Sequence, residues 1–395
     1  MTTTFKSKRY DLAVDTITEA DIRELIDWLR AYPRLTMAHV TREFEKAWSE
    51  WLGVRYSVFC NSGSSANLLM YAALDSTGRS RNRGIVVPAV GWSTTVGPSL
   101  QLGWKPVMCE ADPLRYSLDA RALERLLREH RPDNVILVHV LGTPADMEPI
   151  LALQEKYKFN LMEDCCAAHG ARFRGRKVGT FGAMSSFSFF YGHHMSTIEG
   201  GMVSTNDEEL YHHLLMLRSH GWCKDLPPEK YRELMAEHGV DSFHCPFTFI
   251  LPGFNLRPLD LTARIGLSQL PRLDETVRRR AENHRRYQQR LEGAVEFARV
   301  GEADLISSIS FGGVAASNAQ RKVIVSALVK NEIDTRLFSA GNLGRHPFWT
   351  KRHGVFSAPV ADRIHDGGFF LPNNQSLDAG DIDFVSDVVI KAVRG

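Results

Sequence analysis

Short, almost continuously apolar runs alternate with amphipathic segments along the first 165 residues. The apolar runs predict strands, and the segments with helical spacing of apolar residues predict helices. Strands that are apolar at nearly every position are typical of a mostly parallel sheet covered by helices on both faces, so the predicted fold class is α/β. The expected strands are 57–60, 84–90, 106–112, 134–140 and 159–165, and the expected helices are 16–31, 40–52, 67–74, 122–130 and 147–157.

The expected N-terminal helix has a capping residue and one apolar face. Thr18 can cap its start, because a threonine side chain accepts a hydrogen bond from the first turn. Ile22, Leu25, Ile26 and Leu29 then share one side of the helix.

The pattern changes after about residue 260. Residues 261–293 predict long helical structure rich in arginine, which we interpret as a solvated or domain-bridging helix in preference to an anion-binding one. An apolar run at 306–314 and a helical segment at 317–331 indicate a smaller α+β domain. We therefore expect an N-terminal arm and large α/β domain in residues 1–260, and a bridging helix and small C-terminal domain in residues 261–395.

Composition and charge narrow the functional classes. The 395 residues contain 48 Lys and Arg against 46 Asp and Glu, a net charge of +2, so neither nucleic acid nor a membrane surface is expected as the main partner. No apolar run is long enough to span a bilayer, and the polar start lacks a signal-peptide core, so we expect a cytoplasmic protein. The six cysteines include no C-x-x-C pair, which favours reduced thiols over a metal site or a disulfide framework.

Three segments at predicted strand ends could carry chemistry. Residues 61–67 (NSGSSAN) join a strand to a helix, and such a turn presents free N–H groups that can bind phosphate, although most turns of this kind are only turns. Asp164 ends an apolar strand, where a carboxylate can pair with a protonated ring nitrogen or cap the chain. Trp92 follows another strand, where an indole can stack on a cofactor or belong to the core.

The stretch 185–205 is the most unusual part of the sequence. Hydroxyl and aromatic side chains lead into His193-His194 and then into an EGG triplet at 199–201. Paired histidines are more often incidental than catalytic, and a metal site would lack a third ligand nearby. The order along the chain is informative: a phosphate turn, a stacking aromatic, a strand-end aspartate, a serine–aromatic–histidine stretch and EGG.

In that order the sequence resembles the sugar aminotransferases of the DegT/DnrJ/EryC1/StrS family, which are pyridoxal phosphate enzymes of fold type I. The resemblance extends from about residue 15 to the end. The matching motifs are the serine–glycine turn at 62–65, the ED pair at 163–164, HGA at 169–171, RxHG at 218–221 and GxNxR at 253–257. The resemblance implies the fold type I aminotransferase architecture.

One departure from the family pattern decides the expected function. The family has a lysine five positions after the serine that corresponds to Ser188, and this lysine binds the cofactor covalently. His193 stands there in this chain, and an imidazole cannot form that bond. The resemblance therefore implies pyridoxal 5'-phosphate and pyridoxamine 5'-phosphate bound non-covalently, with His193 as the catalytic base, as in the 3-dehydratases of nucleotide-linked 4-keto-6-deoxy sugars.

Two kinds of such dehydratase are known in the family. One acts on a CDP-linked sugar and carries an iron–sulfur cluster, and the other acts on GDP-4-keto-6-deoxy-D-mannose in colitose biosynthesis, has no cluster and uses L-glutamate. Cys223 and Cys245 are too sparse for a four-thiolate cluster, so we expect the cluster-free reaction, which yields a 4-keto-3,6-dideoxy sugar, 2-oxoglutarate and ammonia. EDCC at 163–166 and the segment 335–348 are similar to the cluster-bearing kind, which leaves a CDP- or dTDP-linked substrate and a separate reductase as an alternative.

The resemblance also assigns roles to residues. The expected cofactor-binding residues are Gly63, Ser64, Trp92, Asp164, Ser188 and, across the interface of a homodimer with shared active sites, Asn255. The expected substrate-binding residues are Pro33, Arg34, Leu35, Thr36, His220, Lys224 and Arg257, and the last three are candidates for binding the carboxylates of glutamate. No metal is expected.

His193 has two expected tasks. It would remove a proton from the cofactor and protonate the departing 3-hydroxyl group, and the usual imidazole pKa of about 6.5 suits both. The colitose-forming enzymes have a glutamate at the position of Ala167, so Cys166, His169 or water would have to replace it. A lysine-less homologue that binds sugar nucleotide or cofactor without catalysis is the alternative from a different class.

Overall fold

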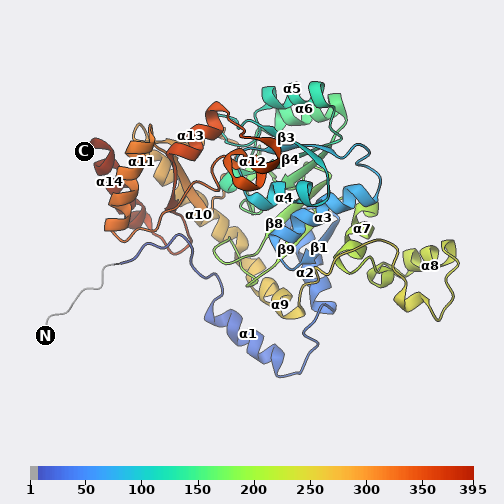
Figure 1. Ribbon diagram of the computed structural model, residues 1–395. Helices are drawn as coiled ribbons and strands as arrows, with labels where there is room; N and C mark the ends of the chain where they lie inside the picture. Colours follow the sequence, from blue (N-terminus) through green and yellow to red (C-terminus); the bar gives the residue numbers. More distant parts are fainter. Residues whose placement is uncertain (1–7) are drawn as a thin grey trace.

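A seven-stranded sheet forms the centre of the computed structural model, which describes residues 8–395 (Figure 1). Its strand order is β1-β9-β8-β5-β4-β2-β3, and neighbouring strands are parallel except that β9 is antiparallel to both β1 and β8. The mostly parallel sheet predicted from the sequence is therefore confirmed. The strands are β1 Tyr56–Cys60, β2 Gly84–Pro88, β3 Lys105–Cys109, β4 Asn134–Val138, β5 Asn160–Asp164, β8 Met184–Ser188 and β9 Gly201–Thr205.

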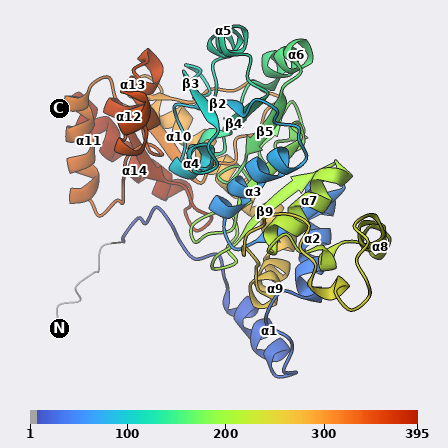
Figure 2. The same ribbon diagram turned by 45° about the vertical axis from the view of Figure 1, so that its right-hand side comes forward.

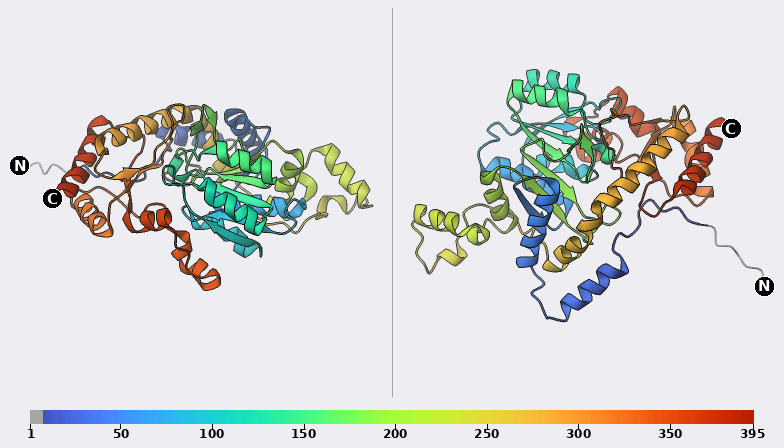
Figure 3. Two further views of the ribbon diagram at one scale, coloured as in Figure 1. Left: turned by 90° about the horizontal axis from the view of Figure 1, so that it is seen from above. Right: turned by 180° about the vertical axis from the view of Figure 1, so that it is seen from behind.

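Helices cover both faces of this sheet, as expected for strands that are apolar throughout (Figure 3). Along β4, Ile136 belongs to one hydrophobic cluster, while Val135 and Leu137 belong to another on the opposite face. The first cluster includes residues of α3 Gly63–Ser76, α4 Ser93–Gln101 and α7 Glu208–Arg218, and the second includes residues of α5 Ala120–His130 and α6 Met147–Tyr157.

The N-terminal helix α1, Glu19–Leu29, projects from the body of the molecule (Figure 1). Thr18 caps it as predicted, in a reciprocal capping box with Asp21. Its apolar face is only partly used, because Ile22 is 42% and Ile26 is 46% exposed. An amphipathic helix that leaves part of its stripe in water offers a surface to another molecule.

A second, three-stranded sheet lies beyond the long helix α10, Leu273–Leu291 (Figure 2). Arginines of α10 pair with acidic residues of α14, as in Arg286 with Asp383 and Arg290 with Asp387. These pairs engage arginines of α10 with protein carboxylates, within the C-terminal part of the chain. The elements are β10 Glu296–Phe297, β11 Ser310–Val314, β12 Gly368–Pro372, α11 Asn318–Lys330, α12 Pro347–His353, α13 Pro359–Gly367 and α14 Ala379–Arg394.

Between α7 and α9, Asp260–Gln269, the chain makes a long excursion that carries α8, Pro228–Glu237, away from the sheet (Figure 1). The ends of the excursion pair with each other through the bridge between Ser219 and Asn255. A short hairpin of β6 Arg172–Phe173 and β7 Arg176–Lys177 lies elsewhere on the surface. None of the helices in residues 8–395 has the length and apolarity needed to cross a bilayer.

The buried carboxylate of Asp260, the first residue of α9, binds the start of a helix near the N-terminus of the chain. It accepts hydrogen bonds from the backbone N–H groups of Ala38, Val40 and Thr41 at 2.7, 3.2 and 3.0 Å. It thereby caps α2, His39–Leu52, because the N-cap residue before this helix, Ala38, supplies no side-chain hydrogen bond.

Candidate active site

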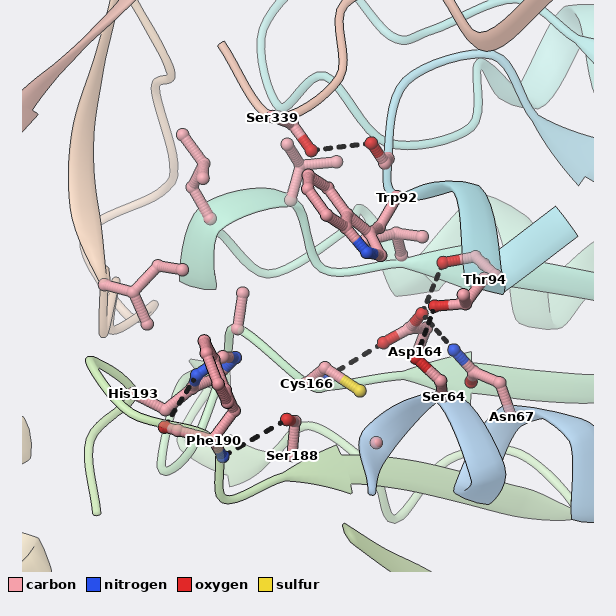
Figure 4. Close-up of a pocket in the computed structure, with 18 of the residues that line it drawn as sticks. Ser64, Asn67, Trp92, Thr94, Asp164, Cys166, Ser188, Phe190, His193 and Ser339 are labelled. Carbon is pink, nitrogen blue, oxygen red and sulfur yellow. Dashed lines mark hydrogen bonds between the residues drawn. The ribbon is translucent and has the colours of Figure 1, made fainter. Parts of the chain in front are cut away.

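A cavity of about 340 Å³ opens at the carboxyl ends of the parallel strands (Figure 4). This is the edge where ligands bind in open α/β sheets. Six residues predicted from the sequence line it: Gly63, Ser64, Trp92, Asp164, Ser188 and His193. They come from the turn after β1, the loop after β2, the ends of β5 and β8 and the loop that follows β8.

Gly63 begins helix α3 at one side of the cavity, where backbone N–H groups are free to bind an anion. A Cβ atom at this position would lie 2.5 Å from the Cβ atom of Ser188, so only glycine fits. Ser64 is exposed to the cavity, and its hydroxyl donates to Thr94 Oγ1 at 3.1 Å. The N-terminus of α3 and the hydroxyl groups of Ser64 and Thr94 together form a cradle that suits a phosphate group.

The carboxylate of Asp164 is buried and points toward the cavity (Figure 4). Asn67 Nδ2 and Thr95 Oγ1 donate to Oδ2 at 2.9 and 2.6 Å, and the N–H of Cys166 donates to Oδ1 at 3.0 Å. No Lys, Arg or His among residues 8–395 forms an ion pair with it within 4 Å, and a buried carboxylate without a cation is costly. The cavity therefore presents a negative charge that a protonated ring nitrogen would neutralise.

Glu163, its neighbour in the ED motif, faces the other way and has a structural task. Its carboxylate accepts backbone N–H groups of Gly179, Phe181 and Gly182 and pairs with His139 Nε2 at 3.1 Å. Burial alone would raise the pKa of Glu163, but His139 and these N–H groups lower it. The group formed by His139, Glu163 and Cys165 has metal-ligand atoms, yet both the imidazole and the carboxylate are already engaged with the protein.

His193 stands partly exposed at the cavity wall on the loop after β8 (Figure 4). Its Nδ1 lies 3.1 Å from the carbonyl oxygen of Phe190. A carbonyl only accepts, so Nδ1 carries the proton and Nε2 keeps a lone pair. Burial, with the nearby charges of Arg280 and Arg336 acting in the same direction, lowers the pKa of His193 to about 4, although the carbonyl of Phe190 acts to raise it. The imidazole is therefore neutral near pH 7, which corrects the usual pKa assumed from the sequence.

His169 does not replace the acid that Ala167 lacks. It is fully buried and bonds to His194 at 3.1 Å between the two Nδ1 atoms, and burial lowers the pKa of both imidazoles well below the usual range. It does not line the cavity, whereas Cys166 and Ala167 do. His169 is therefore not the replacement for the acid, and Cys166 or water remains.

The remaining predicted residues form a separate group, here called the distal cluster: Pro33, Arg34, Leu35, Thr36, His220, Lys224, Asn255 and Arg257. None of them lines the cavity in this chain. Two members are bonded directly, because Arg257 Nε donates to Asn255 Oδ1 at 3.1 Å. Thr36 and His220 are held by neighbours of this pair, through a bridge to Leu259 and a hydrogen bond from the His220 N–H to the Phe254 carbonyl at 2.5 Å. Lys224 lies over the ring of Trp222, 3.5 Å from its centroid.

Sequence reasoning missed several residues of the cavity. Asn67 and Thr95 hold Asp164 in place, and they lie in the NSGSSAN and GWSTT segments, so their position at strand ends could have identified them. Arg336 also lines the cavity, but it comes from the C-terminal part, and no local pattern distinguishes it.

The cavity residues fit pyridoxal phosphate. The cradle at Gly63 suits the phosphate, the uncompensated carboxylate of Asp164 suits a pyridinium nitrogen, and Trp92, 50% exposed, offers a ring face. Comparison with known proteins agrees with this fit. A model of the DegT/DnrJ/EryC1/StrS aminotransferase family matches residues 15–390. The chain belongs to this family.

Members of the family similar to this chain include sugar dehydratases. GDP-4-keto-6-deoxy-D-mannose 3-dehydratase of Yersinia pseudotuberculosis is 34% identical over 351 residues, which cover 86% of this chain and 88% of that protein. A solved structure of a histidine-to-asparagine variant of GDP-4-keto-6-deoxymannose-3-dehydratase with bound GDP-perosamine superposes with a TM-score of 0.88 at 30% identity, covering 96% of this chain and all of that one. A structure of that type of enzyme with a trapped PLP-glutamate geminal diamine has a TM-score of 0.87 at 29% identity, covering 96% of this chain and all of that one.

Proposed function

We propose that this protein is a pyridoxal phosphate-dependent, iron–sulfur-free 3-dehydratase of GDP-4-keto-6-deoxy-D-mannose. With L-glutamate as amino donor it would produce the 4-keto-3,6-dideoxy sugar, 2-oxoglutarate and ammonia. The observation that carries the proposal is His193, a neutral imidazole that lines the cofactor-type cavity at the family's lysine position. The dehydratases that this chain resembles over most of its length support the same reaction.

When bound, pyridoxamine phosphate supplies an amine that condenses with the sugar ketone and a ring that accepts electrons. Asp164 holds a proton at the ring nitrogen, and Asn67 and Thr95 keep its carboxylate oriented. Nε2 of His193 would take the proton from a carbon atom of the cofactor, because Nδ1 is bonded to the carbonyl oxygen of Phe190. The protonated imidazole can then deliver that proton to the leaving 3-hydroxyl group.

We propose that the distal cluster completes the site across a homodimer interface. Arg257 and Asn255 are bonded to each other, but no member of the cluster lines the cavity of its own chain. Its member Leu35 is 45% exposed, and apolar side chains close to the cluster in the sequence are exposed as well, Tyr32 at 95% and Leu259 at 47%. Asn255 would then serve the phosphate of the other subunit, while His220, Lys224 and Arg257 would serve the carboxylates of glutamate. Analytical ultracentrifugation tests this arrangement. Holoenzyme that sediments as a dimer would support it, and a monomer with full activity would exclude it.

The domain organisation and location are also proposals. We propose residues 1–260 as the arm and the large cofactor-binding domain, and residues 261–395 as the bridging helix and the small domain. The separate hydrophobic cluster around β11, β12 and α14 supports this division. A cytoplasmic site of action suits six unpaired thiols.

The deciding experiment incubates holoenzyme with GDP-4-keto-6-deoxy-D-mannose and L-glutamate and identifies the product by mass spectrometry. The expected product has lost one oxygen atom, with 2-oxoglutarate and ammonia in equal amounts. Parallel reactions with CDP- and dTDP-linked sugars test the nucleotide. Folded holoenzyme that is reduced by glutamate to its pyridoxamine form but yields no deoxygenated sugar would contradict the proposal.

A further inference from the structure

Arg336 presents an unpaired guanidinium group at the cavity that contains His193. It lines this cavity together with Trp92 and Ser339. Within residues 8–395 its guanidinium forms no hydrogen bond and no ion pair, and its contacts are with the rings of Trp92 and Phe370, whose centroids lie 5.8 and 4.8 Å away. Arg345, in the turn 343–345, differs from Arg336 in having acidic partners, because it pairs with Asp362 and Asp366 at 3.5 and 3.1 Å.

The backbone around Arg336 is firmly held. The N–H of Phe370 donates to the Arg336 carbonyl at 3.0 Å, and Leu337 forms a bridge with Phe369 in the second sheet. Ser339 donates to the carbonyl of Gly91 at 2.6 Å, next to Trp92 (Figure 4). The second sheet thus holds the backbone of Arg336 against the loop after β2. Binding of a ligand therefore costs little conformational entropy of this backbone.

Few charged side chains line the cavity, and one of them is a cation with which an anionic substrate could pair. Its acidic lining residues are Asp164 and Glu199, and His193 is neutral near pH 7. Arg336 is the one Lys or Arg side chain among the lining residues. Burial lowers its pKa from the usual value, yet a guanidinium stays charged at neutral pH, and an anion beside it would offset the loss of water.

We propose that Arg336 binds the anionic oxygens of a substrate, either a carboxylate of the amino donor or the diphosphate of the sugar nucleotide. This inference rests on the proposed function, because that reaction brings both anions to one cavity. A guanidinium matches each of these groups with two parallel hydrogen bonds. Lys224 and Arg257, the cations expected from the sequence, do not line this cavity in the same chain.

The test compares Arg336→Gln and Arg336→Lys with Arg176→Gln. Arg176 is a matched control: it is exposed, has no acidic partner among residues 8–395, lies over a ring (4.2 Å to the Phe181 centroid) and is outside the cavity. Glutamate affinity is measured from the absorbance change of holoenzyme in a single half-reaction, and diphosphate affinity by calorimetric titration of holoenzyme with GDP.

In Arg336→Gln, the affinity for glutamate, GDP or both should fall at least about tenfold, with a smaller loss in Arg336→Lys and none in Arg176→Gln. A loss for glutamate alone identifies the carboxylate, and a loss for GDP alone identifies the diphosphate. Both affinities within about twofold of wild type would overturn the inference. If Arg336→Gln does not fold, Arg336→Lys decides, because it keeps the charge and loses only the fork.

Failure of this inference is distinguishable from failure of the proposed function. A wild-type enzyme that binds glutamate and GDP but forms no deoxygenated sugar refutes the dehydratase and leaves the binding role of Arg336 intact. A wild-type dehydratase with unchanged affinities in Arg336→Gln refutes only the role of Arg336.

Discussion

The cavity and the distal cluster differ in how complete they are within one chain. In the cavity, Asp164 has three hydrogen-bond donors and His193 has its Nδ1 anchored, all from the same subunit. In the distal cluster, Lys224 and Asn255 are exposed and do not line this cavity of their own chain. One chain therefore supplies the groups that suit the cofactor, whereas a role for the distal cluster in the same site depends on the homodimer proposed above.

The largest expected effect is that of His193→Lys. Dehydration should fall by about 10²–10⁴-fold, because the neutral base is lost, and the lysine should bind the cofactor covalently. Mass spectrometry after borohydride reduction detects the bond. His193→Asn is the control, which should lose dehydration without covalent attachment. Dehydration at the wild-type rate in His193→Lys would show that a group other than His193 is the catalytic base.

Asp164→Asn should have the next largest effect. It removes the charge that holds the ring proton and keeps the volume, so the glutamate half-reaction should slow by about 10–100-fold. Stopped-flow absorbance measures that rate. Thr95→Val is the matched control, since it removes one donor to the carboxylate and keeps the charge. Equal rates in the two variants would mean that the charge of Asp164 has no role.

Mixed dimers test the comparison between the two regions directly. His193→Asn and Asn255→Ala are each expected to have little activity as homodimers. If the cavity and the distal cluster of different subunits form one site, then a refolded equal mixture should regain about a quarter of the wild-type sites. No regain, with hybrid dimers present by mass spectrometry, would place both residues in the site of one chain.

The smallest expected effect concerns pH. The glutamate half-reaction should slow as the pH falls through the pKa of His193, because protonation occupies Nε2. The groups that act on this pKa are the carbonyl of Phe190 and the charges of Arg280 and Arg336. Removing a cation favours the protonated form, so Arg336→Gln should move the acidic limb to higher pH by less than about one unit.

Single-turnover rates in one buffer series that extends below the His193 pKa of about 4 measure the position of this limb. Arg176→Gln should leave the limb unchanged. A displacement to lower pH in Arg336→Gln would contradict the electrostatic contribution of that guanidinium to His193.

The sequence was sufficient for the parts of the site that lie at strand ends. Asp164 could be predicted because its apolar strand is visible locally and the carboxyl ends of parallel strands meet at one edge, whereas Ser188 was implied by the resemblance to the family. Arg336 could not, since its approach to Trp92 depends on how the second sheet packs against the first. Burial of His169 likewise results from tertiary packing, and no local pattern reports it.

Some elements also differ from their expected lengths for identifiable reasons. The strand expected at 306–314 begins only at Ser310, because Ser307 and Ser308 bond instead to the imidazoles of His194 and His284. The helix expected at 16–31 is shorter at both ends, since its capping box sets its start after Thr18. The excursion with α8 has weak apolar periodicity and was not foreseen.

The cap that Asp260 places on α2 has a consequence for biosynthesis. The carboxylate and the N–H of Ala38 are separated by 222 positions, so during translation the start of α2 stays uncapped until residue 260 has left the ribosome. Strand β1 waits in the same way for β9, which pairs Tyr56 with Thr205. A nascent chain thus acquires the Pro33–Thr36 segment in its final place only after the strands that carry Asp164 and Ser188 have emerged.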